Sequence, residues 1–292
     1  MQLFNLLART TVRRLDEFNA QGLANTAWAF AKVTTVAQQD VQLFMALAKT
    51  TEWYLDEFNA QDLANTAWAF AIVGLPDVRL FTALARTAEQ PVCEFNSQEL
   101  TNTAWAFATV AHQDVQLFRT LARMAEWRLD EFNAQELANT AWAFAKVGQP
   151  DLQLFMALTR LAERCLDEFN TQDLANTAWA FAIAGAPAPA LLDPISVLDV
   201  MEAQGAEPQL MYYAMSMQGL ATMGQIKDGF ALLARAEANS LLSDFRNESY
   251  PMFHTLIQGC RFVGDFNSMS RAQAALDRLG LIALAPSATA IM

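Results

Sequence analysis

The sequence predicts an all-α fold, an α-solenoid of stacked helical hairpins, on the basis of three observations. The heptapeptide Asn-Thr-Ala-Trp-Ala-Phe-Ala occurs five times without change, and its tryptophans are spaced 40, 37, 37 and 37 residues apart. A fixed period of this size is typical of stacked supersecondary units. Apolar residues recur at helical spacing, and no segment alternates with the period of two that marks a strand. The five tryptophans are Trp28, Trp68, Trp105, Trp142 and Trp179.

The first helix of each unit, helix A, is predicted from its N-cap and its apolar face. Asn59 is a favourable N-cap, and Asp62 three residues later completes the pattern of a capping box. We expect helix A over residues 60–73, with Leu63, Ala67 and Phe70 on one apolar face. The same Asn and Asp/Glu pair recurs in the later units, whereas Gly22 interrupts it in the first one.

The second helix, helix B, follows a turn that contains Gly74 or Gly148 in two units. We expect its N-caps to be Asp40, Asp77, Asp114 and Asp151. A first helix B is expected over residues 2–15, and Leu80, Phe81 and Leu84 show the apolar face of a later one.

Three segments follow along the chain. Residues 1–185 form the array of 37–40-residue hairpins, residues 186–194 form a Pro/Ala-rich junction, and residues 195–292 form a second helical array. In the second array we expect helices over residues 195–204, 210–223 and 226–238, followed by a further pair over residues 252–279.

Composition limits the classes of function. The chain has 292 residues, 53% of them apolar, and a net charge of −12, and both arrays are acidic. This balance counts against the basic surface usual in nucleic-acid binders.

The three cysteines are far apart, so no disulfide framework is expected. No apolar run reaches the length of a membrane helix. Gln2-Leu3-Phe4 aligns with Gln42-Leu43-Phe44, so we expect a piece of a longer protein, with any targeting segment outside it.

The first array resembles a known type of repeat. The stretch Phe-Asn-Ala-Gln-Asp-Leu-Ala-Asn-Thr-Ala-Trp-Ala-Phe-Ala at residues 58–71 is similar to octotricopeptide-type repeats and to the repeats of fas-activated-kinase-like and RAP-domain proteins. The resemblance covers residues 1–185, because Leu-Ala-Asn-x-x-Trp-Ala recurs in register. It implies an α-solenoid that handles RNA in mitochondria or chloroplasts.

The second array looks like pentatricopeptide repeats, on a looser match that includes Gln218-Gly219-Leu220 and residues 254–259. In that family a polar residue on the first helix and one at the end of the motif contact a base. Here the first position falls on Ala214 and His254, and the last on Asp244. Ala214 has no side-chain hydrogen-bonding group, which counts against base-specific contacts in this array.

The candidate RNA-contacting residues of the first array are the Asn-Thr pairs of the heptapeptides. We expect them to form a polar stripe along a groove of A helices that meets single-stranded RNA, one unit per nucleotide. Their constancy predicts a homopolymeric target or no sequence preference. The alternative, which we favour, is an Asn ladder that hydrogen-bonds neighbouring hairpins. The pairs are Asn25/Thr26, Asn65/Thr66, Asn102/Thr103, Asn139/Thr140 and Asn176/Thr177.

Two further sets of recurring residues, the tryptophans and the basic residues of helix B, are interpreted as structural. The tryptophans could stack on bases, but their position beside Ala and Phe favours a core layer. A basic residue recurs at one place on helix B and could follow a phosphate backbone. A Glu three residues later in four units favours ion pairs on a solvated face instead. The basic residues are Arg9, Lys49, Arg86, Arg123 and Arg160, and the acidic ones are Glu52, Glu89, Glu126 and Glu163.

No pattern of a catalytic site, cofactor site or metal site occurs in the sequence. His112 and His254 have no Cys, His or Asp at ligand spacing. We therefore expect an RNA-binding helical-repeat protein of organellar RNA processing, stability or translation, not an enzyme, with no membrane or small-molecule ligand. Single-stranded RNA and possible protein partners follow from the resemblance. The alternative is a protein-interaction scaffold, which the negative charge favours.

Overall fold

The computed structural model of the chain describes residues 2–33, 41–90, 94–186, 194–203 and 210–238, with single residues and short runs between 254 and 274. Within these residues all regular structure is α-helix or 3-10 helix, and no strand occurs. The predicted all-α fold of packed neighbouring helices is thus confirmed. The chain divides into two compact units, Met1–Leu161 and Ala162–Met292.

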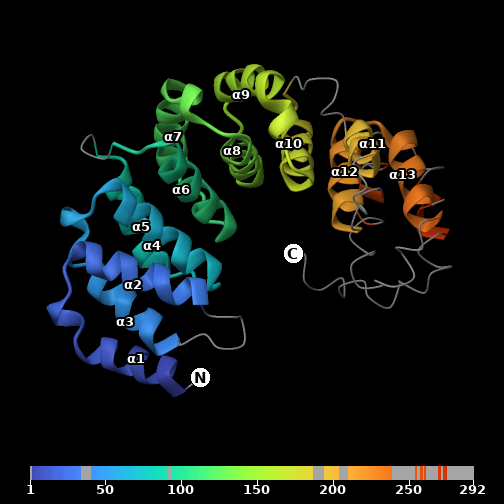
Figure 1. Ribbon diagram of the computed structural model, residues 1–292. Helices are drawn as coiled ribbons and strands as arrows, with labels where there is room; N and C mark the ends of the chain where they lie inside the picture. Colours follow the sequence, from blue (N-terminus) through green and yellow to red (C-terminus); the bar gives the residue numbers. More distant parts are fainter. Residues whose placement is uncertain are drawn as a thin grey trace. The chain divides into compact units, whose positions relative to one another are not determined.

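The first unit consists of two helix layers (Figure 1). The A layer contains α2 (Ala20–Val33), α4 (Ala60–Ile72), α6 (Ser97–Thr109) and α8 (Ala134–Lys146). The B layer contains α1 (Gln2–Arg13), α3 (Val41–Thr51), α5 (Val78–Ala88) and α7 (Val115–Trp127), and α9 (Leu152–Cys165) follows α8. Each A helix packs along the next A helix, and each B helix contacts the next B helix. The alanines of the heptapeptide allow this close approach, because their side chains add little thickness to the interface.

The core between the two layers contains the same aromatic contact in successive repeats. A Phe of each B helix packs edge-to-face on the Phe of the next A helix, for example Phe44 on Phe70 with ring centroids 5.3 Å apart. The same arrangement recurs in Phe81 on Phe107, at 5.0 Å. These rings are almost completely buried. Edge-to-face pairs of this kind contribute about 0.5–1.5 kcal/mol each beyond the area that they bury.

The predicted N-caps of the A helices are present. Asn59 Oδ1 accepts a hydrogen bond from the Asp62 backbone N–H at 2.9 Å, and Asp62 Oδ2 accepts one from the Asn59 N–H at 3.3 Å. The same reciprocal capping box begins α6 and α8, and also α10 in the second unit. In α2 only half of it forms: Asn19 Oδ1 accepts from Gly22 N–H at 2.8 Å, and Gly22 has no side chain to return the bond.

The turns between A and B helices also follow the prediction. Asp77, Asp114 and Asp151 each accept a backbone N–H at the start of a B helix, as in the 3.0 Å bond from Leu80 N–H to Asp77 Oδ1. Asp40 lies outside the described residues. Gly74 ends α4 in the left-handed region, with φ of 63°, and Ala111 holds the equivalent position after α6 with φ of 55°.

A short 3-10 helix connects each of four B helices to the next capping Asn, and the sequence did not predict it. Its sequence is Leu-Asp-Glu in every case, and its Leu backbone oxygen accepts a hydrogen bond from the following Phe N–H. The four segments are η1 (Leu15–Glu17), η3 (Leu55–Glu57), η4 (Leu129–Glu131) and η5 (Leu166–Glu168). The two carboxylates of each of these four segments therefore lie at helix ends, away from the middle of the A helices.

The second unit contains α10 (Thr171–Ala184), α11 (Pro194–Ala203), α12 (Leu210–Thr222) and α13 (Ile226–Ala238), close to the predicted bounds. Helix α10 packs on α11 and α12, and α12 packs on α13. Arg235 of α13 forms ion pairs with two residues of α11, Asp199 at 2.7 Å and Glu202. In the chain, the boundary between the two compact units follows Leu161. It lies before the predicted junction at 186–194, most of which lies outside the described residues.

Candidate functional site

One face of each A helix carries the same polar and aromatic residues in every repeat. A Gln, an Asn and a Trp occur at positions i, i+4 and i+7, followed by a variable residue at i+11. At 100° per residue these four positions lie on one side of a helix, about 140–180° from the buried Leu63 or its equivalents. We call this surface the A face. In the first unit its residues are Gln21, Asn25, Trp28 and Lys32; Gln61, Asn65, Trp68 and Ile72; Gln98, Asn102, Trp105 and Thr109; Gln135, Asn139, Trp142 and Lys146.

The tryptophans of the first unit are partly exposed, so their predicted place in the core is wrong. Trp28 is 41% exposed, and Trp68, Trp105 and Trp142 are half-buried. Trp68 lies about 140° around the helix from Leu63, so it cannot point into the same interface. In the second unit the prediction holds, because Trp179 is only 8% exposed and its Nε1 donates to Gln218 Oε1 at 2.9 Å.

Tryptophans of consecutive repeats follow one another as a row. The rings of Trp105 and Trp142 are stacked, with centroids 6.5 Å apart and planes inclined by 30°. Lys32 Nζ lies 5.6 Å from the centroid of Trp28 and 5.2 Å from that of Trp68. The variable residue of the first repeat thus stands between two tryptophans, where its ammonium interacts with both rings.

The asparagines of the A face keep their hydrogen-bonding groups available. Asn25 is exposed, and Asn65, Asn102, Asn139 and Asn176 are half-buried. Within the described residues their side-chain amides form no hydrogen bond, so the alternative of an Asn ladder between hairpins is wrong. Each amide retains two donor hydrogens and an acceptor oxygen for a ligand or for water.

The threonines next to these asparagines do not belong to the A face, contrary to the prediction. Thr66, Thr103, Thr140 and Thr177 are at most 2% exposed. Thr140 Oγ1 lies 3.1 Å from Thr101 Oγ1 of the preceding repeat, and Thr26 Oγ1 donates to the Gly22 backbone oxygen at 2.7 Å. Neighbouring residues on a helix point about 100° apart, so an Asn on the A face places the next Thr in the interface.

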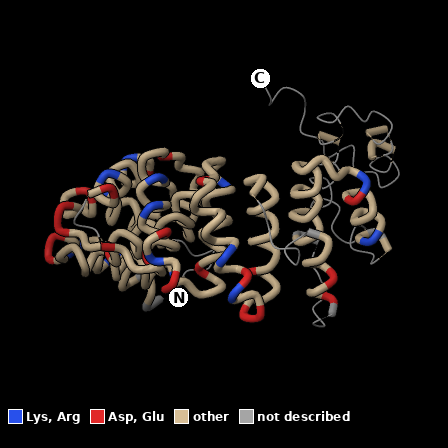
Figure 2. Tube along the Cα trace, turned by 90° about the horizontal axis from the view of Figure 1, so that it is seen from above, with Lys and Arg blue, Asp and Glu red and all other residues tan. Residues whose placement is uncertain are grey.

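The A face is neutral to positive in a chain whose net charge is −12. The acidic residues of α2, α4, α6 and α8 are Asp62, Glu99 and Glu136, and each accepts the backbone N–H of its N-cap Asn. Lys32 and Lys146 are the basic residues of these helices. Figure 2 shows long uncharged stretches along the helices of the first unit, with most acidic residues at helix ends and turns. Global charge therefore does not describe this surface.

Burial raises the pKa of two capping carboxylates, Asp62 and Asp173. Desolvation raises the pKa of Asp62 above its ordinary value, and the hydrogen bond from the Asn59 backbone opposes this shift. The pKa of Asp173 in the second unit is raised for the same reason. These carboxyl groups serve the helix ends and have no access to a ligand.

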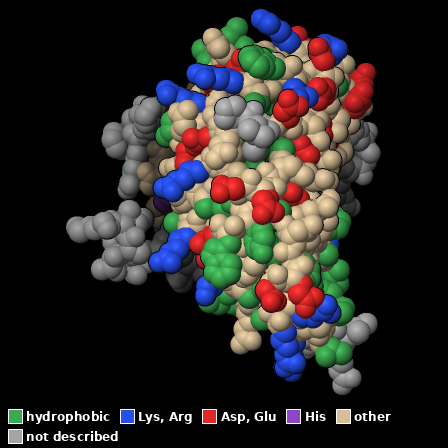
Figure 3. Space-filling view, turned by 90° about the vertical axis from the view of Figure 1, so that its left-hand side faces the viewer, with side chains coloured by type: hydrophobic (Ala, Val, Ile, Leu, Met, Phe, Trp, Pro, Cys, Tyr) green, Lys and Arg blue, Asp and Glu red, His purple; other side chains and the backbone are tan. Residues whose placement is uncertain are grey.

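The basic residues of the B helices do not form the predicted ion pairs. Arg9, Lys49, Arg86, Arg123 and Arg160 are exposed. In the four repeats that have a Glu three residues later, no ion pair joins the two side chains in the described structure. A basic residue that precedes its acidic partner is the less favourable order on a helix. Burial and Asp114 raise the pKa of Glu89, and burial and Asp151 raise that of Glu126 against a smaller opposite effect of Arg123. In the view of Figure 3, Lys and Arg side chains follow one another along the left border of the described surface, with Asp and Glu beside several of them.

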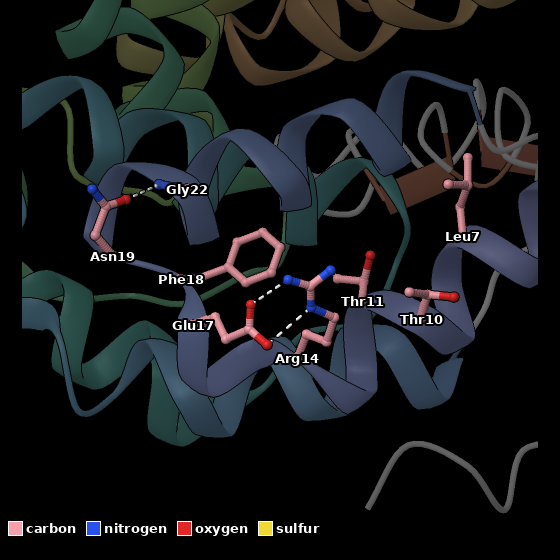
Figure 4. Close-up of a pocket in the computed structure, with 8 residues that line it drawn as sticks. All are labelled: Leu7, Thr10, Thr11, Arg14, Glu17, Phe18, Asn19 and Gly22. Carbon is pink, nitrogen blue, oxygen red and sulfur yellow. Dashed lines mark hydrogen bonds and ion pairs between the residues drawn. The ribbon is translucent and has the colours of Figure 1, made fainter.

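A pocket beside the first helix is explained by the repeat architecture. It has a volume of about 520 Å³ and lies beside α1 and η1, where Arg14 pairs with Glu17 and Asn19 caps Gly22 (Figure 4). Leu7 in its wall is 48% exposed, whereas the equivalent Leu47 is fully buried. The pocket is therefore the open side of the first hairpin, a surface that the preceding hairpin covers in later repeats.

Two smaller pockets repeat at the edge of the B layer. One of about 240 Å³ lies between α3 and the turn at Pro76, and one of about 260 Å³ lies between α7 and the turn at Pro150. Val41 and Val115, the first residues of α3 and α7, form part of their walls and are exposed. Equivalent apolar depressions thus occur two repeats apart on the B layer.

Of the predicted base-contacting residues in the second array, His254 is exposed and helical, with its Nε2 3.3 Å from Gln258 Nε2. Asp244 lies outside the described residues. No group of three potential metal ligands occurs within the described part of the chain. In that same part, none of the helices has the length and hydropathy needed to cross a membrane.

Comparison with known families gives two matches along the chain. Residues 1–152 match the family model described as RNA-editing substrate-binding complex 6 protein. Residues 154–177 match a second model, described as a protein of unknown function. A search of curated proteins gave no match. The first match covers the entire A face of the first unit, whereas specific octotricopeptide or pentatricopeptide repeat families do not appear among the matches.

Proposed function

The chain belongs to the RNA-editing substrate-binding complex 6 protein family, and from this premise we propose that it is an RNA-binding repeat subunit of an RNA-processing complex. In this proposal it holds single-stranded organellar transcripts and has no catalytic activity of its own. The resemblance of its repeats to organellar RNA-handling proteins supports the same assignment, with the mitochondrion as the expected compartment and the chloroplast as the alternative.

The A face is the observation that carries the proposal. It combines four partly exposed tryptophans, free asparagine amides and two lysines, without a free carboxylate, in an otherwise acidic chain. Aromatic rings stack on bases of any sequence, and each stacked base contributes about 1–3 kcal/mol. The amides can donate to or accept from base edges and sugars. A single strand laid across successive A helices would meet one tryptophan in each repeat.

A binding measurement with matched tryptophan variants tests the proposal. Fluorescence anisotropy of labelled homopolymeric RNAs would be followed over a salt series, starting at low salt where phosphate contacts are strongest. We expect the double variant Trp105→Ala/Trp142→Ala to lose at least about tenfold in affinity, from the loss of two stacking surfaces. Trp127→Ala is the control, since Trp127 belongs to the B layer and is 89% exposed. Undetectable binding of the parent at low salt would contradict the proposal.

A second candidate function, docking of a protein partner, is favoured by the exposed aliphatic residues of the B layer. Val78, Val115 and Leu152 are the first residues of their B helices and are 69%, 56% and 62% exposed. They lie next to the apolar pockets at the turns, on the layer opposite the A face. A subunit of a complex needs such a surface in addition to its RNA-contacting face.

Two double variants, one on each layer, test RNA binding and protein docking separately. Val115→Glu/Leu152→Glu is expected to release the protein from its native complex in size-exclusion chromatography while RNA affinity stays unchanged. Trp105→Ala/Trp142→Ala is expected to do the reverse. Loss of both properties in both variants would indicate that the assignment of separate faces is wrong.

A further inference from the structure

We propose that the variable residue of the A face, four positions after each tryptophan, sets the nucleotide preference of its repeat and thereby fixes the register of the bound strand. This inference rests on the proposed RNA-binding function. The residues concerned are Lys32, Ile72, Thr109 and Lys146.

The first argument is the pattern of variation on the face. In all four repeats of the first unit, Gln, Asn and Trp occupy the other three positions without exception. A strand that met only these residues would bind equally well after a shift by one repeat. Discrimination between registers needs a residue that differs from repeat to repeat, and on this face only the fourth position differs.

The second argument is the location of that position. Lys32 Nζ lies within 5.6 Å of the ring centroids of both Trp28 and Trp68, so its side chain spans the interval between two consecutive repeats. Because the repeats share one backbone pattern, Ile72 and Thr109 hold the equivalent place after Trp68 and Trp105. Both are exposed. A base stacked on one of these tryptophans would have its edge beside the variable side chain.

The third argument is the chemistry of the four residues. Lysine offers an ammonium with three donors and no acceptor, which suits the acceptor-rich edges of guanine and uracil. Isoleucine offers no hydrogen bond, and would leave the polar edge of a base in water or against the neighbouring Asn amide. Threonine has a hydroxyl that both donates and accepts. The order Lys, Ile, Thr, Lys therefore presents different surroundings to successive bases.

A swap of two residues tests the inference without changing composition or charge. In Lys32→Ile/Ile72→Lys the cationic side chain moves by one repeat, and overall electrostatic attraction to RNA is preserved. Selection from a library of random RNA octamers, followed by sequencing, gives the preference at each position. We expect the preferences at the two positions to exchange, with changes of about 3–10-fold, while affinity for homopolymers stays within about twofold.

The control is a matched swap on the B layer, Gln116→Arg/Arg119→Gln, which relocates a cation on α7 between two exposed positions and should leave the selected sequences unchanged. Thermal unfolding followed by circular dichroism shows whether each swap retains the fold. If the parent selects and binds RNA but the A-face swap leaves its preferences unaltered, this inference is wrong and the proposed function stands. An equal loss of affinity for all RNAs would also overturn it, as a phosphate contact acts without regard to sequence. Failure of the parent to bind any RNA overturns the proposed function itself.

Discussion

The same heptapeptide meets two different surroundings in the two units. In the first unit Trp28 is 41% exposed and lies on the A face with Lys32, whereas Trp179 in the second unit is 8% exposed and donates to Gln218 of α12. The heptapeptide and its helical conformation are alike in both, although the capping box is complete in α10 and only half formed in α2. Identical local sequence therefore supports a partly open aromatic surface in one unit and a packed, hydrogen-bonded residue in the other.

The difference shows that the tryptophan position is not part of the hairpin core. The invariant core consists of Leu and Phe residues between the layers, such as Phe70 against Phe44. The tryptophan side is left open by the repeat and becomes buried only where another element, here α12, packs over it. A surface available in four repeats is thus a packing interface in the fifth.

The largest expected effect is on stability at the two tryptophans. Trp179→Ala should destabilise the second unit by about 3–5 kcal/mol, because it empties a buried site. Trp28→Ala should cost about 1 kcal/mol or less, since much of its ring already contacts water. Hydrogen exchange of peptides from α10 and α12 against those from α2 would resolve the two units. Equal losses of stability in the two variants would show that the two tryptophans do not differ in their packing.

The second effect concerns the hydrogen bond that holds Trp179. Gln218→Ala should destabilise the second unit by about 1–2 kcal/mol, because the indole N–H loses its acceptor in a buried site. Gln225→Ala is a suitable control, as the Gln225 side chain is exposed. Urea unfolding monitored by tryptophan fluorescence measures both. A neutral effect of Gln218→Ala would mean that burial alone holds the ring.

The third effect distinguishes the buried threonines of the first unit. Thr140→Val should cost about 1 kcal/mol, since it removes the contact with the Thr101 hydroxyl. Thr66→Val should be neutral or stabilising by up to about 1 kcal/mol, because the Thr66 hydroxyl is buried without a hydrogen-bond partner. Both changes conserve volume. Neither change should alter RNA affinity. A loss of binding with retained stability would indicate that the threonines contact RNA.

The smallest effect is a pH dependence at the capping boxes. Burial raises the pKa of Asp62 in the folded state, so its protonated form is favoured by folding. The contribution of this group to stability is greatest below its unfolded pKa and is lost as the pH rises through the folded one. Relative to Asp62→Asn, the parent should therefore gain stability on acidification from pH 7. Asp173→Asn in the second unit should show the same sign, and a gain with rising pH would contradict the burial argument.

Local signals in the sequence were sufficient for the helices and their ends. The pairs Asn59/Asp62 and Asn96/Glu99 specified the capping boxes, and Asp77 specified the start of α5, because these bonds join residues within one turn. Helical geometry would also have separated Asn65 from Thr66, since adjacent residues point about 100° apart. The Asn-Thr pair therefore does not form one polar stripe: the asparagine lies on the A face, and the threonine lies in the interface between repeats.

Other features could not follow from local patterns. The 3-10 turns depend on how a B helix returns to the next capping Asn, and Leu-Asp-Glu has no strong propensity for them. Arg86 and Glu89 have the spacing of an ion pair, yet Glu89 is placed near Asp114 of the following repeat instead. Such arrangements depend on contacts between repeats, and the spacing of residues within one repeat does not predict those contacts.

By itself the sequence determined the period of the array, the helical hairpins, their caps and the Leu/Phe core. These properties arise from backbone hydrogen bonding and from apolar periodicity within each repeat. Only the tertiary structure decided which polar and aromatic side chains remain accessible. Accessibility depends on which neighbour packs over a face, and a repeat that is identical in sequence has different neighbours at different places in the chain.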